Sequence, residues 1–202
     1  MCGGAITTCG FAGAGFGGSL STIGAGLGFP CVLKKPDSAF SQGVVKVENE
    51  QELHEKLKTF LSESDLIVAQ EFLPTTFDWR IGILDQRPLY ACKYFMAQNH
   101  WQIIRQDRTG PDRYGKAETL PVELAPRAAV RTALRAANLI GNGLYGVDVK
   151  QSGDHFYVIE VNDNPSIDSG VEDNILKDEL YRRIAESFLR RIELQKAGLR
   201  SE

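Results

Sequence analysis

Three residues near the C-terminal end, Asp148, Glu160 and Asn162, have types and spacing suited to metal-dependent chemistry. They lie in the segment GLYGVDVKQSGDHFYVIEVNDNP, in which two alternating runs flank the turn residues 152–154. This pattern predicts a β-hairpin. If the hairpin folds about Asp154, Asp148 lies opposite Glu160, and Asn162 shares the face of Glu160 because side chains alternate along a strand.

Two carboxylates at opposed strand positions favour a bound cation. Opposed Cβ atoms lie about 5 Å apart, and two like unit charges at that distance repel by about 3 kcal/mol at an effective dielectric of about 20. A divalent ion reverses this repulsion. Two carboxylates and one amide suit Mg²⁺ held beside a phosphate, with Mn²⁺ as the alternative ion. Asp148, Glu160 and Asn162 are therefore predicted metal ligands.

The alternative interpretation is a polar strand that simply faces solvent. The apolar opposite face of the hairpin argues against it, and so does the turn after Asn162, which adds further oxygen atoms. Carboxylates that face each other are also unfavourable on an ordinary surface strand. The predicted apolar face consists of Val147, Val149, Tyr157, Ile159 and Val161.

Composition indicates one globular unit without a membrane span. The chain has 202 residues, 43% of them hydrophobic and 24% charged, with a net charge of −3. This charge gives no reason to expect nucleic acid or an anionic membrane as a partner, and no run reaches the roughly 20 apolar residues that a span needs. The four cysteines show no Cys-x-x-Cys spacing. A cytoplasmic location is the default expectation.

The elements that must position these residues follow from hydrophobic periodicity and turn signals. From Phe29 onward we expect strands and helices, with a long polar loop at 106–121. Asn49 and Glu52 form a capping box at the start of the first helix. Besides the hairpin, the predicted strands span 29–34, 43–47, 66–70, 79–84, 89–95 and 101–105, and the later helices span about 126–140 and 174–195.

Residues 1–28 form a glycine-rich segment of low complexity without a charged side chain. We expect it to be irregular. It contains Gly13-x-Gly15-x-x-Gly18, the spacing of a dinucleotide fingerprint, but the sequence before it is a poor strand and the motif needs one. A dinucleotide-binding protein that uses this segment is therefore a minor alternative.

The loop after Lys34 has features of a phosphate-binding loop. Lys34 ends an apolar strand, and the residues that follow include Ser38, Ser41 and Gly43. Small and hydroxyl residues let backbone N–H groups approach an anion, and the lysine adds a point charge. The alternative is a strand that ends in an ordinary surface lysine.

In their order and spacing, four segments resemble the ATP-grasp fold and, within it, the RimK-like carboxylate–amine ligases. The resemblance covers Phe29 to about Arg191. It implies an α+β fold with nucleotide held between the antiparallel sheets of two lobes. The lobes would span 29–78 and 79–195, with a tail at 196–202. The segments are FPCVLKKPDSAFSQGVVKV, VAQEFLPTTFDWRIGIL, RPLYACKYFMAQNHWQI and GLYGVDVK…FYVIEVNDNP.

The resemblance also implies roles for individual residues. Lys34 would contact nucleotide phosphates, Asp78 would lie at the ribose end, and the ligands of Mg²⁺ would be Asp148, Glu160 and Asn162. Lys93, Arg80 and Arg105 are candidate catalytic cations, for which plain surface charge is the alternative. The hinge that would bind the adenine edge consists of Gln70, Glu71, Phe72 and Leu73.

The implied activity is ATP-dependent formation of an amide or peptide bond through an acyl phosphate. The substrates would be a small-molecule or peptide carboxylate and an amino acid such as glutamate. Against the family pattern, we expect the domain that normally precedes this fold to be missing from the chain. The alternative is therefore a truncated, non-catalytic ATP-binding module, and a second copy or a partner chain is expected to supply the missing part.

Overall fold

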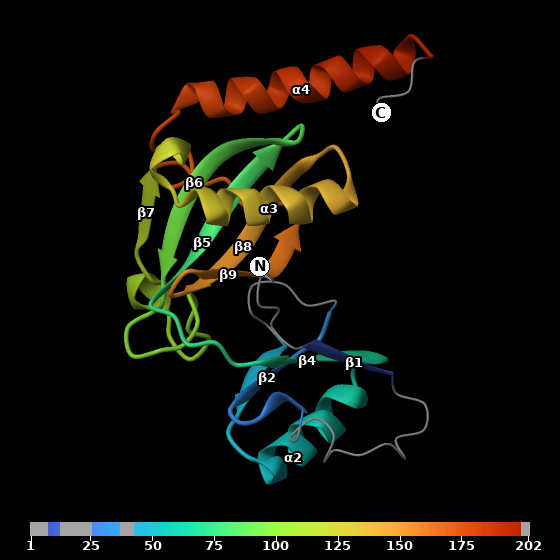
Figure 1. The fold of residues 1–202 in the computed structure, drawn as a ribbon, viewed down its shortest axis with the longest axis vertical. Coiled ribbons are helices and arrows are strands. Elements are labelled where there is room, and N and C mark those ends of the chain that lie inside the picture. The colour runs from blue at the N-terminus through green and yellow to red at the C-terminus, as the bar shows by residue number, and fades with distance from the viewer. Residues whose placement is uncertain (1–7, 13–25, 37–42, 199–202) are drawn as a thin grey trace. The chain divides into compact units, whose positions relative to one another are not determined.

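The structure is a computed structural model that describes residues 8–12, 26–36 and 43–198. The chain forms two compact units, which we call the N-terminal and C-terminal units (Figure 1). Of the described residues, 8–12, 26–36, 43–74 and 104–113 belong to the N-terminal unit, and the rest belong to the C-terminal unit. The break falls between Pro74 and Thr75 instead of after residue 78, and part of the predicted loop joins the N-terminal unit.

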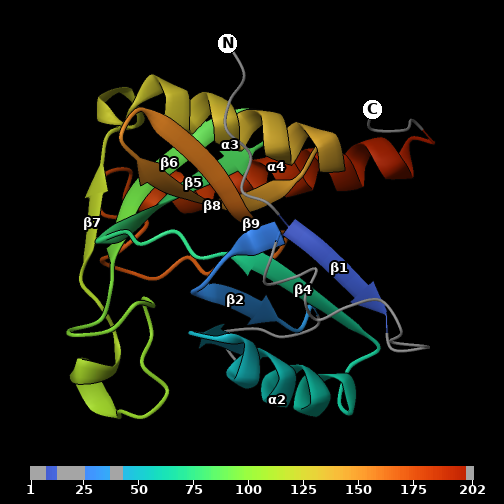
Figure 2. The same cartoon turned by 60° about the horizontal axis from the view of Figure 1, so that its bottom comes forward.

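An antiparallel four-stranded sheet with a helix on one face forms the N-terminal unit (Figure 2). Its elements are β1 (Thr8–Ala12), β2 (Cys31–Lys34), β3 (Val44–Val47), α2 (Glu50–Leu61) and β4 (Leu66–Glu71), and the strand order is β1-β4-β2-β3. Leu53, Leu57 and Phe60 of α2 are buried against the inward residues of the sheet, such as Leu33 and Ile67. The predicted strands 29–34, 43–47 and 66–70 are thereby confirmed within one or two residues at each end.

Part of the glycine-rich start is ordered as a strand. Thr8–Ala12, which we expected to be irregular, pairs antiparallel with β4 and forms one edge of the sheet. Backbone pairing needs no large side chain, so a strand can form where the sequence lacks a hydrophobic pattern. The Gly13, Gly15 and Gly18 motif lies outside the described residues, as do Ser38 and Ser41 of the predicted phosphate loop.

The predicted capping box at the start of α2 is confirmed. The Asn49 side chain accepts a hydrogen bond from the Glu52 backbone N–H at 3.0 Å, and the Glu52 carboxylate accepts one from the Glu48 N–H at 2.9 Å. The first contact satisfies a donor that the first helical turn leaves without a partner, and the second binds the chain just before the cap.

Replacing Asn49 by Ala is expected to lower the free energy of unfolding by about 1 kcal/mol, because the Glu52 N–H loses its acceptor. Urea unfolding followed by circular dichroism measures the effect. Gln51→Ala is the matched control, since Gln51 is exposed in the same turn and its side-chain amide donates to the Glu55 carboxylate, not to the helix cap. Equal losses in both variants would contradict a specific capping role.

The C-terminal unit contains a five-stranded antiparallel sheet in the order β7-β6-β5-β8-β9. Its strands are β5 (Phe77–Leu84), β6 (Arg87–Phe95), β7 (Ala117–Leu120), β8 (Leu144–Ser152) and β9 (His155–Asn162). Two short 3₁₀ helices lie in the connections, η1 (Gly110–Arg113) in the N-terminal unit and η2 (Val122–Leu124) in this one. Asp85 and Gln86 turn β5 into β6 with φ angles of 49° and 60°.

A different helix covers each face of this sheet. On one face, α3 (Arg127–Ile140) packs through Ala129, Ala133 and Ala137 against β5, β6 and β8. On the other, Leu180 of α4 (Asp178–Lys196) lies in a second cluster with Tyr90 and Cys92 of β6. The predicted helices 126–140 and 174–195 are confirmed, although α4 begins four residues later. No helix among the described residues is long and apolar enough to cross a membrane.

The predicted strand 101–105 is wrong. Residues 101–103 form bends and Ile104 makes only an isolated bridge, whereas β7 lies inside the predicted loop. Around this segment the backbone groups are satisfied by local bonds, such as Ala97 N–H to the Gln102 carbonyl at 2.9 Å. The strand that pairs with β6 at this edge is instead β7, Ala117–Leu120.

A β-bulge in the β8–β9 hairpin changes which side chains of β9 lie on each face of the sheet. Ser152 pairs with His155 and Val149 with Val158, but Asp148 pairs with Glu160, so Ile159 is the extra residue. A bulge residue shifts the alternation of its strand by one. The core face of β9 therefore holds Phe156, Val158 and Val161, and the prediction that Tyr157 and Ile159 lie on it is wrong.

Candidate active site

The predicted pairing of Asp148 with Glu160 is confirmed. They are cross-strand partners on β8 and β9, and Asn162 lies one alternation further along, opposite Gly146. The Asn162 amide donates to the Gly146 carbonyl at 3.4 Å. The face of the sheet that carries Asp148, Glu160 and Asn162, opposite α3, is called the polar face below.

Arg80 of β5 is the cross-strand neighbour of Asp148 on the other side. Its guanidinium makes a bidentate ion pair with the Asp148 carboxylate, with Nε–Oδ1 at 2.7 Å and Nη2–Oδ2 at 2.8 Å. The same group lies 5.0 Å from the centre of the Tyr94 ring. Burial opposes the charge on Arg80, but Asp148 outweighs it and holds the pKa of Arg80 above its ordinary value.

Among the carboxylates of the polar face that were predicted site residues, Asp78 is the most buried, with 8% of its surface exposed. Its Oδ1 accepts hydrogen bonds from Lys150 Nζ at 2.7 Å and Thr75 Oγ1 at 2.8 Å. Burial raises the pKa of Asp78, although the neighbouring ammonium of Lys150 lowers it. Lys150 was missed by sequence reasoning, although its even spacing from Asp148 places it on the same face.

Glu172 is a second functional candidate that the sequence did not reveal. It is fully buried, accepts a hydrogen bond from the Tyr94 hydroxyl, and accepts another from the Asp168 backbone N–H at 2.8 Å. Burial raises the pKa of Glu172. Tyr94 thus contacts both residues. Its hydroxyl donates to the Glu172 carboxylate, and its ring lies beside the Arg80 guanidinium that pairs with Asp148. No periodicity or motif marks Glu172, because it lies in an irregular segment.

The segment after Asn162 passes close above β8. A Cβ atom at Gly146 would lie 2.7 Å from Cβ of Pro165, closer than real contacts allow. Gly146 therefore permits the turn after Asn162 to approach the polar face. The sequence pattern Asn162–Pro165 was expected to form such a turn, and the structure explains why a glycine lies opposite it.

The donor chemistry of the polar face fits a hard divalent cation. An ionised carboxylate offers about four lone-pair sites, and Arg80 uses two of those on Asp148. Glu160 is exposed and directly opposite. No group of three or more His, Cys, Asp or Glu side chains in the described part of the chain is arranged to hold a metal. A cation held here would take two carboxylates and an amide from this chain, and waters or phosphate oxygens would have to complete its shell.

Two of the three predicted catalytic cations, Arg80 and Lys93, belong to the C-terminal unit and lie on opposite faces of its sheet. Only Arg80 lies on the polar face. Lys93 pairs with Trp79 on the face covered by α3, where its Nζ lies 3.4 Å from a Glu118 carboxylate oxygen. Arg105 belongs to the N-terminal unit and pairs with Asp107, with Nη2–Oδ2 at 2.6 Å.

In the N-terminal unit, Lys34 and Gln70 share the sheet face opposite α2. Lys34 pairs with Val68 and Val32 with Gln70, which places both polar residues on that face by alternation. Lys46, missed by sequence reasoning, pairs with Val32 on the same face, and its Nζ lies 4.9 Å from the centre of the Phe72 ring. The face therefore joins cationic and amide groups with an aromatic ring.

The remaining predicted nucleotide residues lie near that face or at the ends of its strands. Glu71 is the exposed last residue of β4, and Leu73 follows it half-buried. Gly43 precedes β3 with a φ of 69°, and its carbonyl accepts a hydrogen bond from Lys35 N–H at 3.0 Å. This left-handed conformation favours glycine at position 43.

The sequence has relatives among curated proteins. It is 29% identical over 153 residues to a probable alpha-L-glutamate ligase of Nitrosococcus oceani, covering 75% of this chain and 48% of the relative. It is also 29% identical over 168 residues to one of Syntrophotalea carbinolica, covering 82% and 51%. The chain thus spans about half the length of the curated relatives it matches.

Solved structures with the same fold include D-alanine–D-alanine ligase from Bacillus anthracis. The TM-score is 0.73 at 20% identity, covering 92% of this chain and 62% of the ligase. The same enzyme in complex with ATP has a TM-score of 0.67 at 20% identity, covering 92% and 59%. These values support the predicted mixed α+β fold of ATP-grasp type.

A family model described as the RimK-like ATP-grasp domain matches residues 19–187. This range includes every strand of both sheets except β1, and all the named residues of the polar face. The chain therefore belongs to the RimK-like ATP-grasp family of ligases.

Proposed function

We propose that this chain is the ATP-binding and catalytic part of a carboxylate–amine ligase that adds glutamate or another amino acid to a carboxylate. The observation that carries the proposal is the polar face, where Asp148 and Glu160 are cross-strand partners and Arg80 forms a bidentate ion pair with Asp148. The glutamate ligases to which the chain is similar, and the ATP complex of a ligase with its fold, support the choice of reaction.

The reaction proceeds in two displacements. A carboxylate oxygen of the first substrate bonds to the γ-phosphorus of ATP, and the bond from that phosphorus to the β,γ-bridging oxygen breaks, releasing ADP. The amine nitrogen of the amino acid then bonds to the carbonyl carbon of the acyl phosphate. The carbon–oxygen bond to phosphate breaks, inorganic phosphate leaves, and the amine gives up a proton to solvent.

Phosphoryl transfer asks a protein mainly for positioning and for stabilisation of negative charge. A bound Mg²⁺, held by Asp148, Glu160 and Asn162, would supply charge neutralisation at the phosphates. Arg80 orients Asp148 and places a fixed positive charge at the polar face. In the N-terminal unit, Lys34 and Lys46 supply cations for the phosphates, while Gln70 and the Phe72 ring bind the base.

A release assay for ADP and phosphate, run with Mg²⁺, ATP and paired carboxylates and amino acids, tests this function. We expect ADP to form only when both Mg²⁺ and a carboxylate are present, and stoichiometric amide to form when the amino acid is added. Hydroxylamine should trap the acyl phosphate as a hydroxamate.

Calorimetry with a non-hydrolysable ATP analogue separates the main alternative from this function. Analogue binding without ADP release for any substrate pair would favour a non-catalytic ATP-binding module. Failure to bind the analogue at all would contradict both.

A further inference from the structure

The C-terminal unit has a cleft of about 780 Å³ where α4 lies beside the β5–β6 turn. None of Arg80, Asp148, Glu160 and Asn162 lines it. Four arginines line it, Arg87 from β6 and Arg183, Arg190 and Arg191 from α4, and Leu84 and Leu89 provide apolar walls. A volume of this size matches that of sites for small organic ligands.

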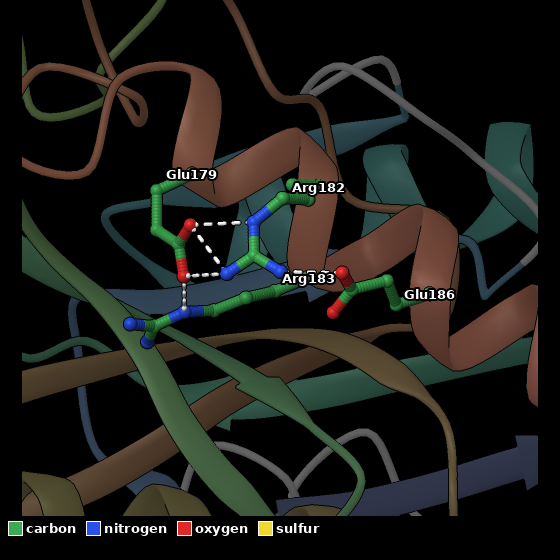
Figure 3. A network of polar contacts seen from close by, with 4 residues as sticks. All are labelled: Glu179, Arg182, Arg183 and Glu186. Carbon is green, nitrogen blue, oxygen red and sulfur yellow. Dashed lines mark hydrogen bonds and ion pairs between the residues drawn. The ribbon is translucent and has the colours of Figure 1, made fainter.

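The cleft has an excess of positive charge. Arg182 bonds Glu179 at 2.8 Å and also Glu186, while Arg183 bonds Glu179 at 2.7 Å, as Figure 3 shows. Of these four residues, Arg183 and Glu186 line the cleft, and the network pairs the Glu186 carboxylate with Arg182. The lining holds four arginines and two carboxylates, Asp85 and Glu186, a net charge of +2.

The guanidinium groups in the cleft retain capacity for an anion. Arg190 bonds one Asp85 oxygen at 2.7 Å, and Arg191 bonds the other. An arginine carries five N–H donors, so each keeps most of them for a ligand. The Arg87 guanidinium makes no hydrogen bond or ion pair with any residue that the structure describes.

Ser187 lines the cleft beside Asp85. It is 1% exposed, and its hydroxyl makes no hydrogen bond of ordinary distance and angle within the described part of the chain. Burial raises the pKa of Asp85, but the nearby Ser187 hydroxyl and the guanidinium groups of Arg191 and Arg190 outweigh it and hold that pKa below its usual value. Asp85 is therefore a poorly aligned acceptor for Ser187, and a ligand oxygen in the cleft would be a better one.

We propose that this cleft binds a small organic oxyanion, a phosphate or carboxylate compound with an apolar body, at a site distinct from the polar face. The head group would accept hydrogen bonds from Arg87, Arg191 and Ser187, and the body would lie against Leu84 and Leu89. Leu84, which lines the cleft, follows Arg80 by four residues along β5, so about 13 Å of strand separates it from the ion pair at Asp148.

The test is a per-residue ¹⁵N–¹H NMR titration of the full chain with pyrophosphate and, separately, with citrate. The expected result is saturable shifts at Ser187 and Asn142 with at least one probe. Shifts with pyrophosphate alone assign phosphate chemistry, and shifts with citrate alone assign carboxylate chemistry. Arg87→Gln is expected to weaken binding by about tenfold, because it removes a charge-assisted donor.

Ser187→Ala is expected to weaken binding about fivefold with the melting temperature unchanged or raised, since an unsatisfied buried hydroxyl is removed. Arg131→Gln, an exposed arginine on α3, is the matched control for loss of charge. The proposal is overturned if neither probe shifts the cleft residues, or if Arg131→Gln weakens binding as much as Arg87→Gln. ATP turnover plays no part in this measurement, so the proposed ligase activity can fail independently.

Discussion

Glu160→Gln is expected to lower magnesium-dependent ATP turnover by about 100-fold or more while leaving the fold intact. The change removes one of the two opposed carboxylates, and a divalent ion held beside triphosphate depends on their charge. Glu160 is exposed, and Asp148 with its Arg80 ion pair is left in place. The measurement is turnover against Mg²⁺ concentration, in which the half-saturating concentration should rise.

The matched control is Glu118→Gln. Glu118 is also an exposed strand carboxylate of this sheet, but it pairs with Lys93 on the face covered by α3. Its turnover should stay within about twofold of the original chain, as expected for surface changes away from a reacting group. An unchanged magnesium dependence in Glu160→Gln would remove Glu160 from the metal site. Asp148→Asn should lose turnover too, with an added loss of stability because it leaves Arg80 without its carboxylate.

Lys150→Met is expected to lower the free energy of unfolding of the C-terminal unit by about 3 to 5 kcal/mol at neutral pH. Lys150 Nζ lies 2.7 Å from the Asp78 carboxylate, which is 8% exposed, so its loss leaves a buried charge without its ion pair. Urea unfolding followed by tryptophan fluorescence reports on this unit, because Trp79 is buried beside Asp78. Lys116→Met, at an exposed position of the same unit, is the control.

The effect should shrink as the pH falls. Burial already raises the pKa of Asp78, and removing the Lys150 ammonium raises it further. A carboxyl with a raised pKa in the folded state contributes most stability below its ordinary pKa, and this contribution is lost as the pH rises through the folded-state value. Adding Asp78→Asn to Lys150→Met should restore much of the loss. A deficit that is independent of pH and survives in the double variant would contradict the buried-charge explanation.

In the hairpin, the predicted pairing of Asp148 with Glu160 is correct, although the predicted register of the residues nearer the turn is wrong. Folding about Asp154 places Asp148 opposite Glu160, and they are indeed partners. The turn, however, is centred between Gly153 and Asp154, and the bulge at Ile159 supplies the missing residue. The shift of the turn and the extra residue of the bulge compensate each other from Glu160 onward. Between the turn and Glu160 only the shift of the turn acts, so Tyr157 and Ile159 were assigned to the wrong face.

Local patterns in the sequence determined the helices, most strands, the cap at Asn49 and the candidate metal ligands, because these depend on periodicity and on neighbours a few residues apart. Long-range pairing decided the rest. It placed β7 beside β6 in what looked like a loop, ordered Thr8–Ala12 as an edge strand, and put Lys93 on the face opposite Asp148. The roles of Lys150 and Glu172 follow only from the tertiary structure, which places them beside Asp78 and Tyr94. A buried ionisable residue is identified by the residue that it contacts, and these partners are more than 70 positions away in the sequence.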